Sequence, residues 1–278
     1  PDLPSTAAAL HLSARKVAYF SMEVALDSRV PTYSGGLGVL AGDTLRSAAD
    51  LAIPMIGVTL VHREGYFHQE IRDGGQLELP ERWSPEEMLT RFDPTVEVSI
   101  EGRCVRVGAW RMDVVGSRGH VVPLLLLDTD LADNAMQDRD LSRWLYGGDQ
   151  RYRLGQEVVL GIGGVRMLRA LGCTSIDTFH MNEGHAALAP LEILRTEREG
   201  RSGPWDFLPI RNRCVFTTHT PVPSGHDRFE PGLVRKVLGD LVPDEVLAML
   251  GGRTELNMTQ LALNLSHYVN GVAMRHRE

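Results

Sequence analysis

The sequence lacks long apolar runs, a visible secretory leader and, almost entirely, lysine. Its longest apolar run, residues 121–127, is far too short to span a bilayer, so we expect no membrane segment. No basic region followed by an apolar stretch opens the chain, so no secretory signal is visible. Among 29 basic residues only Lys16 and Lys236 are lysines, and no Gly-Lys-Ser/Thr run occurs, which excludes a P-loop.

Cysteine and excess positive charge are also scarce. Three widely spaced cysteines, Cys104, Cys173 and Cys214, match no metal or redox spacing. Their odd number indicates free thiols in a reducing compartment, so we expect a cytoplasmic protein. The formal net charge of −7 argues against nonspecific binding to nucleic acid, whose phosphates demand a basic face. Any anionic ligand must therefore be bound by a local site.

The remaining composition is that of an ordinary globular protein, with 43% hydrophobic and 23% charged residues. Strand-like and helix-like runs alternate, which predicts one α/β domain over residues 1–278 with a Rossmann-like, mainly parallel sheet and flanking helices. The expected strands cover residues 16–20, 53–62, 176–182 and 213–220. The expected helices cover residues 37–49, 139–171 with a C-cap at Gly172, 183–198, and most of the tail from Pro231.

Two stretches depart from this alternation. From Glu64 to Asp128 several strand-like runs are separated by Gly, Pro and Asp turns, so we interpret residues 64–128 as a β-rich insertion. The last expected helix begins at Met258 and continues to Glu278 without a stop signal. We therefore expect the chain to be part of a longer protein.

Three glycines, Gly35, Gly36 and Gly38, stand directly before the first expected helix. A helix that begins on glycines exposes unpaired backbone N–H groups and the positive end of its dipole, which together favour a bound anion. The run from Gly36 formally satisfies the G-x-G-x-x-G/A dinucleotide fingerprint. That fingerprint follows its strand immediately, however, whereas about 14 residues separate Phe20 from Gly35. A glycine turn that merely packs the helix close to the sheet would explain the same residues.

Polar residues also follow two of the expected strands. In open α/β sheets ligands bind beyond the carboxyl ends of the strands, which makes both clusters candidate site residues. The first cluster contains His180, Asn182, Glu183 and His185, and the second contains Thr217, Thr218, His219 and Thr220.

These residues also have alternative interpretations. His180, Glu183 and His185 lie close to the H-x-x-E-H pattern of zinc proteases, but they straddle a strand-to-helix turn instead of sharing one helical face, so we expect no metal site. Glu183 and His185 would also suit the first turn of a helix, and His219 a hydrogen-bonded core position. No G-x-S-x-G elbow and no activated cysteine supports covalent catalysis.

Taken in order along the chain, seven motifs resemble the N-terminal part of the α-glucan (glycogen, starch or maltodextrin) phosphorylases. They are VAYFSMEVALDS, YSGGLGVLAGDTLRSAADL, REGYFHQEI, YRLGQEVVLGIGGVRML, FHMNEGHAALAPLEIL, FTTHTPVPSGHDRF and LALNLSHYVNGVAMRH. The resemblance covers residues 16–278 and is closest to the bacterial group that reads T-H-T-P-V-P. It implies the GT-B architecture of two facing Rossmann-like domains, and retaining phosphorolysis of α-1,4-glucans to glucose 1-phosphate. It also implies pyridoxal phosphate as the cofactor, whose phosphate assists the reaction.

The resemblance further implies roles for the glycine loop and one histidine. Gly35, Gly36 and Leu37 match the loop whose backbone amides meet the phosphates and the sugar, with Gly36 also beside the cofactor. His219 matches the catalytic-site histidine that hydrogen-bonds the glucosyl 6-hydroxyl and whose carbonyl faces the developing positive charge.

Two further motifs match the family with differences. Asn182, Glu183 and His185 match a substrate-binding stretch beside the glucose, where animal enzymes read Asn-Asp-Thr-His. The animal and plant pattern E-F-Y-M-G-R supplies an aromatic contact to the cofactor that MEVALDSR lacks, and Tyr33 is the candidate substitute.

In the family the Schiff-base lysine belongs to a C-terminal domain, and neither Lys16 nor Lys236 matches it. We therefore expect an N-terminal domain with half of the active site, no cofactor bound to it, and no activity when alone. The implied partners are α-1,4-glucan, inorganic phosphate and glucose 1-phosphate, without nucleic acid or membrane, and the full-length protein is expected to be a homodimer. A glucan synthase of the same architecture and a non-catalytic carbohydrate-binding domain are the alternatives.

Overall fold

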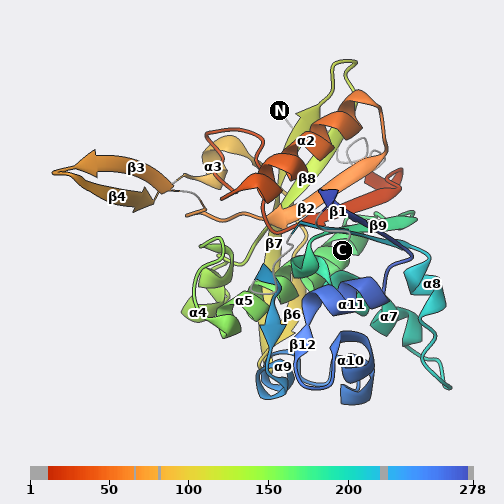
Figure 1. Ribbon diagram of the computed structural model, residues 1–278. Helices are drawn as coiled ribbons and strands as arrows, with labels where there is room; N and C mark the ends of the chain where they lie inside the picture. The colour runs from red at the N-terminus through yellow and green to blue at the C-terminus, as the bar shows by residue number, and fades with distance from the viewer. Residues whose placement is uncertain (1–11, 66, 81–82, 220–224, 275–278) are drawn as a thin grey trace.

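A nine-stranded sheet organises the structure, a computed structural model that describes residues 12–65, 67–80, 83–219 and 225–274 (Figure 1). Six neighbouring strands run parallel, whereas the next strand is antiparallel to them and two short strands are antiparallel to it. The expected α/β fold with a mostly parallel sheet is confirmed. In spatial order the strands are β13 (Tyr268–Gly271), β10 (Cys214–Thr218), β9 (Thr178–Asn182), β1 (Val17–Ser21), β2 (Met55–Leu60), β8 (Val121–Asp128), β7 (Arg103–Val115) and β5 (Thr90–Arg91), and β6 (Val96–Ile100) also pairs with β7.

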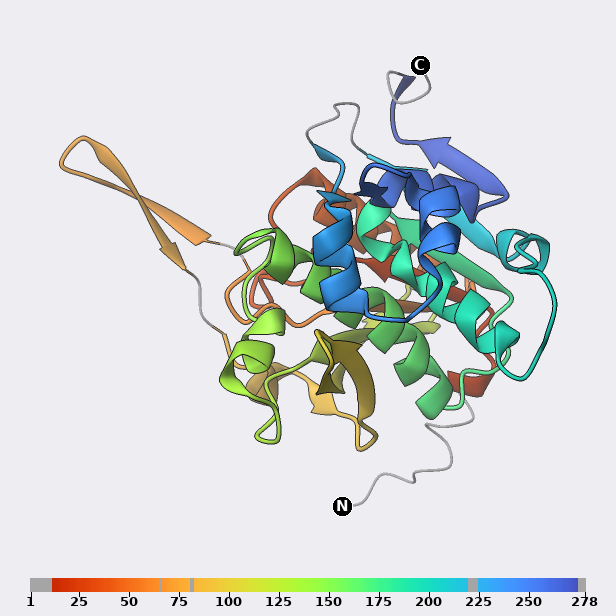
Figure 2. The same ribbon diagram turned by 90° about the horizontal axis from the view of Figure 1, so that it is seen from below.

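Helices cover both faces of this sheet. Helix α2 (Gly36–Asp50) lies on one face, and helices from later in the chain lie on the other, in front of the sheet in Figure 2. The later helices are α5 (Gln150–Glu157), continued by a π-helical segment (Val158–Gly163) and α6 (Gly164–Ala170), then α7 (Leu188–Arg198), α9 (Pro231–Leu238), α10 (Asp244–Gly251) and α11 (Met258–Asn264). The short helices are α3 (Pro85–Met88), α4 (Met136–Arg139) and α8 (Leu208–Arg211). Within the described ranges, no helix combines the length and apolar character needed to cross a bilayer.

Alternation along the strands explains why the core has two layers. On β1, Phe20 packs into the cluster formed with α5 to α7, whereas its neighbour Tyr19 packs with Leu45 of α2 on the other face. Successive strand side chains point to opposite faces, so a strand between two helical layers must be apolar throughout. In strand β2 all residues are buried, and every one except Thr59 is apolar.

The segment from residue 64 to residue 128 divides into two structurally different parts. Strands β7 and β8 belong to the central sheet, where β8 pairs in parallel with β2. By contrast, β3 (Phe67–Arg72) and β4 (Gly75–Pro80) pair only with each other among the described strands, and Figures 1 and 2 show this hairpin projecting from the body. The other small sheet pairs β11 (Arg228–Phe229) with β12 (Leu256–Asn257).

The long helix expected over residues 139–171 begins later than predicted. The chain makes a 3-10 turn at Asp140–Ser142, and the helix starts at Gln150, where the side chain of Asp149 accepts from the amide of Tyr152 at 2.9 Å. The helix ends as predicted, with Gly172 at a φ of 78°. The capping carboxylate of Asp149 therefore sets the start of the helix, which hydrophobic periodicity alone placed about three turns too early.

The prediction of a final helix from Met258 to Glu278 is confirmed only as far as Asn264 and is wrong for residues 268–271, whereas residues 275–278 lie outside the described residues. Helix α11 ends at Asn264, and residues 268–271 form β13 parallel to β10, with Val215 opposite Tyr268. The amide of His267 donates to the carbonyl of Cys214 at 3.2 Å, which starts this pairing. The unpaired edge of β10 therefore outweighed a helical pattern that continued past the turn.

Gly42 of α2 gives a direct test of how closely the helix approaches the chain beside it. A Cβ at this position would overlap the backbone oxygen of Ala25, which cannot swing away as a flexible side chain would. We expect Gly42→Ala in the full-length protein to lower the free energy of unfolding by about 1–3 kcal/mol. Urea unfolding measures this change.

The matched control is Gly232→Ala in α9, where a Cβ would meet nothing within 4 Å. Because alanine favours the helix over glycine, we expect no loss of stability, or a gain of up to about 1 kcal/mol. Equal stability of Gly42→Ala and the wild-type protein would contradict the close approach.

Candidate active site

The predicted polar clusters meet because β1, β9 and β10 are neighbours in the sheet. The register pairs Ser21 with Asn182, and Asn182 with Thr217. The carboxyl ends of three parallel strands therefore lie at one edge, the place where open α/β sheets bind ligands. Glu23 follows β1, Glu183 follows β9, and His219 follows β10.

The glycine loop is organised by Glu23. Its Oε2 accepts hydrogen bonds from the amides of Ser34 and Gly35 at 2.6 and 3.1 Å. Helix α2 then begins at Gly36 without a side-chain cap. The amides of Gly36 and Leu37, in the first turn of α2, have no acceptor among the described residues. The loop thus holds one carboxylate of the protein and keeps further N–H donors at the positive end of a helix.

The glycines of the loop divide between the two roles considered for them. Gly35 and Gly36 are exposed, and a Cβ on either would meet nothing within 4 Å. A Cβ on Gly38 would instead lie 2.6 Å from the Cβ of Tyr33 and 2.8 Å from Oε2 of Glu23. Gly38 is therefore required for packing, whereas Gly35 and Gly36 leave open space above their backbone.

Glu183 links the ends of β9 and β10. It is buried, with a φ of 74° that side chains rarely adopt, and its amide donates to the carbonyl of Thr217 at 2.9 Å. Its Oε1 accepts from the amide of Gly184 at 3.0 Å, as the capping interpretation expected, and its Oε2 accepts from the amide of His219 at 2.7 Å. The three hydrogen bonds of Glu183 thus offset a backbone strain of about 1–3 kcal/mol at this candidate site.

Asn182 orients the ring of His219. Its Oδ1 lies 2.5 Å from Nε2 of His219, and its Nδ2 donates to the hydroxyl of Ser21 at 3.0 Å. Because Oδ1 can only accept, Nε2 of the histidine carries the proton. The buried amide therefore fixes both the position and the tautomer of the half-buried His219.

His180 does not join Glu183 and His185 in a common ligand set. Its Nε2 contacts Oγ1 of Thr217 at 2.7 Å, and its ring meets Tyr19 edge-on at 5.0 Å. Burial, with a smaller contribution from His219, lowers the pKa of His180 to about 4, so the ring is neutral at pH 7. Across the part of the chain that the structure describes, no group of three His, Cys, Asp or Glu residues is arranged to hold a metal ion.

His185 belongs to a charged network that the sequence motifs did not reveal. Its Nε2 lies 3.2 Å from Oδ2 of Asp227, which also pairs with Arg153 at 2.6 Å. The ring of Tyr146 lies 5.4 Å from that of His185, and its hydroxyl donates to Oε1 of Glu23 at 2.9 Å. The network therefore connects the helix that follows β9 to the glycine loop.

The pKa values in this network follow from burial and charge. Burial alone would raise the pKa of Asp227, but His185 and Arg153 outweigh it and hold that pKa below its usual range. Burial, reinforced by the charge of Glu23, raises the pKa of the Tyr146 hydroxyl well above its ordinary value. At pH 7 Asp227 is thus ionised, and Tyr146 is a neutral donor.

Four residues of this site were absent from the predicted set: Glu23, Tyr146, Arg153 and Asp227. The position of Glu23, two residues beyond β1, is the signal that could have found it, since the strand-end rule applies to β1 as well. Of the predicted residues, Tyr33 and Leu37 are half-buried beside the loop, and Thr220 lies outside the described residues.

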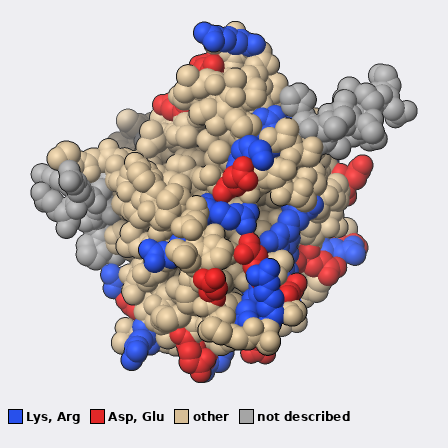
Figure 3. All heavy atoms as spheres, turned by 90° about the vertical axis from the view of Figure 1, so that its right-hand side faces the viewer, with Lys and Arg blue, Asp and Glu red and all other residues tan. Residues whose placement is uncertain are grey.

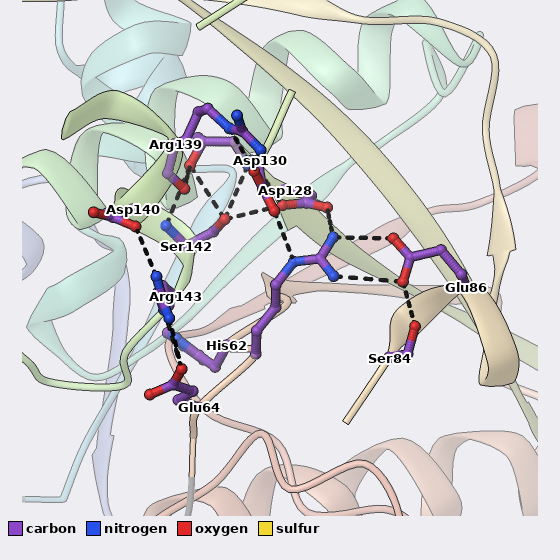
Figure 4. Close-up of polar contacts among 12 residues, drawn as sticks. His62, Glu64, Ser84, Glu86, Asp128, Asp130, Arg139, Asp140, Ser142 and Arg143 are labelled. Carbon is purple, nitrogen blue, oxygen red and sulfur yellow. Dashed lines mark hydrogen bonds and ion pairs between the residues drawn. The ribbon is translucent and has the colours of Figure 1, made fainter. Parts of the chain in front are cut away.

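A second polar cluster lies at the carboxyl ends of β2 and β8, where Figure 4 shows Asp128, Asp130 and Glu86 arranged around one guanidinium group. Arg63 pairs with these three carboxylates at 2.9, 3.5 and 3.3 Å respectively. Buried Asp128 also accepts from Trp110 Nε1 at 2.8 Å. The adjoining cavity, about 290 Å³, is lined by none of the predicted site residues.

Charge balance distinguishes this cavity from the glycine loop. Each arginine that lines it forms ion pairs with neighbouring carboxylates: Arg63, Arg139 and Arg143. On the face shown in Figure 3, acidic and basic side chains are likewise interspersed. A bound anion would therefore gain more from the backbone amides of the loop than from these compensated cations.

Arg63→Met tests the contribution of this cluster. Removing the guanidinium leaves the buried carboxylate of Asp128 without its cation, so we expect the free energy of unfolding of the full-length protein to fall by about 2–3 kcal/mol. The control is Arg235→Met, whose pair with Asp244 leaves both side chains more than 60% exposed. That change should cost less than about 1 kcal/mol. Equal losses in the two variants, measured by urea unfolding, would contradict the assignment.

Comparison with known proteins gives one consistent result. Residues 24–123 match a family model described as carbohydrate phosphorylase. The chain is 41% identical over 273 residues to the maltodextrin phosphorylase of Thermococcus litoralis. The matched region covers 94% of this chain and 32% of that protein. The chain is 39% identical over 289 residues to the glycogen phosphorylase of Mycobacterium tuberculosis, covering 94% and 33%. The chain thus spans about a third of the length of these curated relatives.

Proposed function

Because this chain belongs to the carbohydrate phosphorylase family, as its motifs predicted, we propose that it forms the N-terminal Rossmann-like domain of a GT-B α-1,4-glucan phosphorylase. The full-length enzyme would be a cytoplasmic homodimer that converts glucan and inorganic phosphate to glucose 1-phosphate with retention. The observation that carries the proposal is the meeting of a glycine loop with available amides and the Asn182–His219 pair at one edge of the sheet.

The chemistry of phosphorolysis suits this edge. Breaking a glycosidic bond develops positive charge at the anomeric carbon, while phosphate brings negative charge into the same pocket. The amides of Gly36 and Leu37 would bind phosphate oxygens with donors that do not titrate. Asn182 holds His219 for a hydrogen bond to a sugar hydroxyl, and Glu183 fixes the backbone from which His219 projects.

Pyridoxal phosphate would fit this chain only at its phosphate end. The exposed backbone of Gly35 and Gly36 has room for a phosphate group, the amides of Gly36 and Leu37 supply the donors, and Tyr33 lies beside the loop. Neither lysine lies at the site, because Lys16 pairs with Asp177 at 3.3 Å and Lys236 with Glu101 at 3.4 Å. When bound, the cofactor supplies a phosphate that assists proton transfer. Its covalent attachment would require a lysine from the rest of the protein.

A glucan synthase of the same architecture is the second candidate. Such enzymes also open on a glycine-rich loop, but the residue before these glycines is Ser34, and no lysine is nearby. The names of the relatives favour phosphorolysis over transfer from a sugar nucleotide. A non-catalytic carbohydrate-binding domain would share the fold without turnover.

The deciding experiment incubates the full-length protein with maltodextrin and inorganic phosphate, and separately with maltodextrin and a nucleotide sugar. We expect glucose 1-phosphate in the first mixture and no chain extension in the second. Extension from the nucleotide sugar would establish the synthase, and no turnover in either would favour the binding domain. Residues 1–278 alone should form no glucose 1-phosphate and show no internal-aldimine absorbance.

Gly36→Leu tests the glycine loop itself. The side chain would enter open space where the phosphate is expected, so kcat/KM for phosphorolysis by the full-length protein should fall at least about a hundredfold. The midpoint of thermal unfolding should stay within about 2 °C, because no neighbour is displaced. Wild-type activity in this variant would overturn the assignment of the loop.

A further inference from the structure

Glu157 is a buried carboxyl group to which the proposed reaction assigns no role. It is the last residue of α5, fully buried, and immediately precedes the π-helical segment, a feature often found at functional sites. Neither carboxylate oxygen has a hydrogen-bond donor among the described residues. An ionised carboxylate in such a place would be strongly destabilising, so the group needs either a cation or a proton.

The charged neighbour that acts most strongly on Glu157 is another carboxylate. Asp227 lies within hydrogen-bonding reach of it, and Oδ2 of Asp227 is occupied by Arg153 and His185. Burial, together with the charge of Asp227, raises the pKa of Glu157 well above its ordinary value, and Arg153 opposes this only in part. Two carboxylates in contact cannot both stay ionised when a single arginine serves them.

Charged groups on the other elements packed against this region are committed elsewhere. Glu192 of α7 pairs with Arg166 and Arg195, so it does not compete for the proton of Glu157. The remaining groups on neighbouring elements also have partners: Asp128 with Arg63, Asp140 with Arg143, Glu97 with Arg106, Arg235 with Asp244, and Lys236 with Glu101. The proton balance of Glu157 therefore depends on Asp227, Arg153 and His185.

We propose that Glu157 is a carboxylic acid at neutral pH that donates its proton to Asp227, and that this acid–carboxylate pair is a positioning device for the active site. One proton shared by the two groups leaves a single negative charge, which Arg153 balances. Arg153 also lies over the ring of Tyr146 at 4.8 Å. The pair thus holds Arg153 and His185 against Tyr146, whose hydroxyl holds Glu23 of the glycine loop.

The catalytic consequence rests on the proposed function, whereas the shared proton does not. In the full-length protein we compare Glu157→Gln, whose amide can still donate to Asp227, with Glu157→Met, which has no donor. Glu157→Gln should keep kcat/KM for phosphorolysis within about threefold of wild type. Glu157→Met should lose at least about tenfold, because a charge-assisted hydrogen bond is gone.

Two measurements without substrate test the proton directly. Infrared spectra at neutral pH should contain the carbonyl band of a protonated carboxyl group that disappears in Glu157→Gln. The pH dependence of unfolding should also change. Because the folded-state pKa of Glu157 lies above its unfolded value, the folded protein loses stability as pH rises through this interval. The unfolding midpoint of Glu157→Gln should therefore rise relative to wild type as the pH is raised above about 4 to 5, the ordinary range of a glutamic acid.

The outcomes separate the two proposals. An unchanged infrared spectrum, or parallel pH profiles of unfolding for wild type and Glu157→Gln, would overturn the shared proton. Equal loss of activity in Glu157→Gln and Glu157→Met would overturn its positioning role. A full-length protein with the carboxyl band but no phosphorolysis would leave the shared proton standing and refute the proposed function. If Glu157→Met does not fold, the infrared and pH comparisons of wild type with Glu157→Gln still decide the shared proton, and a loss of more than about threefold in kcat/KM of Glu157→Gln overturns the positioning role.

Discussion

The carboxylate of Glu23 is the contact on which the candidate site depends. One of its oxygens binds two amides of the glycine loop, and the other binds the hydroxyl of Tyr146. A buried carboxylate needs such donors, so Glu23 can be buried only if the loop keeps the shape that points its amides at the carboxylate. The start of α2 is therefore fixed before any ligand arrives, which spares a bound anion the cost of ordering the loop.

This arrangement also determines where an anion can bind. Glu23 would repel a second negative charge at the amides of Ser34 and Gly35, which it already occupies. The amides of Gly36 and Leu37 continue the same row of donors at the end of the helix dipole. A protein with a net charge of −7 can thus bind phosphate through a few backbone groups, without a basic surface.

The sequence predicted features that are local and missed those that join distant segments. Buried apolar runs located β1, β2, β9 and β10, and the rule that ligands lie beyond strand ends selected Asn182, Glu183 and His219. By contrast, the contact of Asp227 with Arg153 joins residues 74 positions apart, and no spacing pattern encodes it. The final helix was wrong for the same reason, because the exposed edge of β10 decided the conformation of residues 268–271.

The order of the strands affects how the protein folds while it is synthesised on the ribosome. Strand β1 lies between β2 and β9, and the side chain of Asn182 reaches Ser21 across 161 residues. At usual rates of synthesis, β1 waits about 10–30 seconds for the strand that will cover its second edge. During that interval the unpaired backbone edge of β1 can pair with other chains. Strand β1 is therefore the segment that a chaperone would most need to protect.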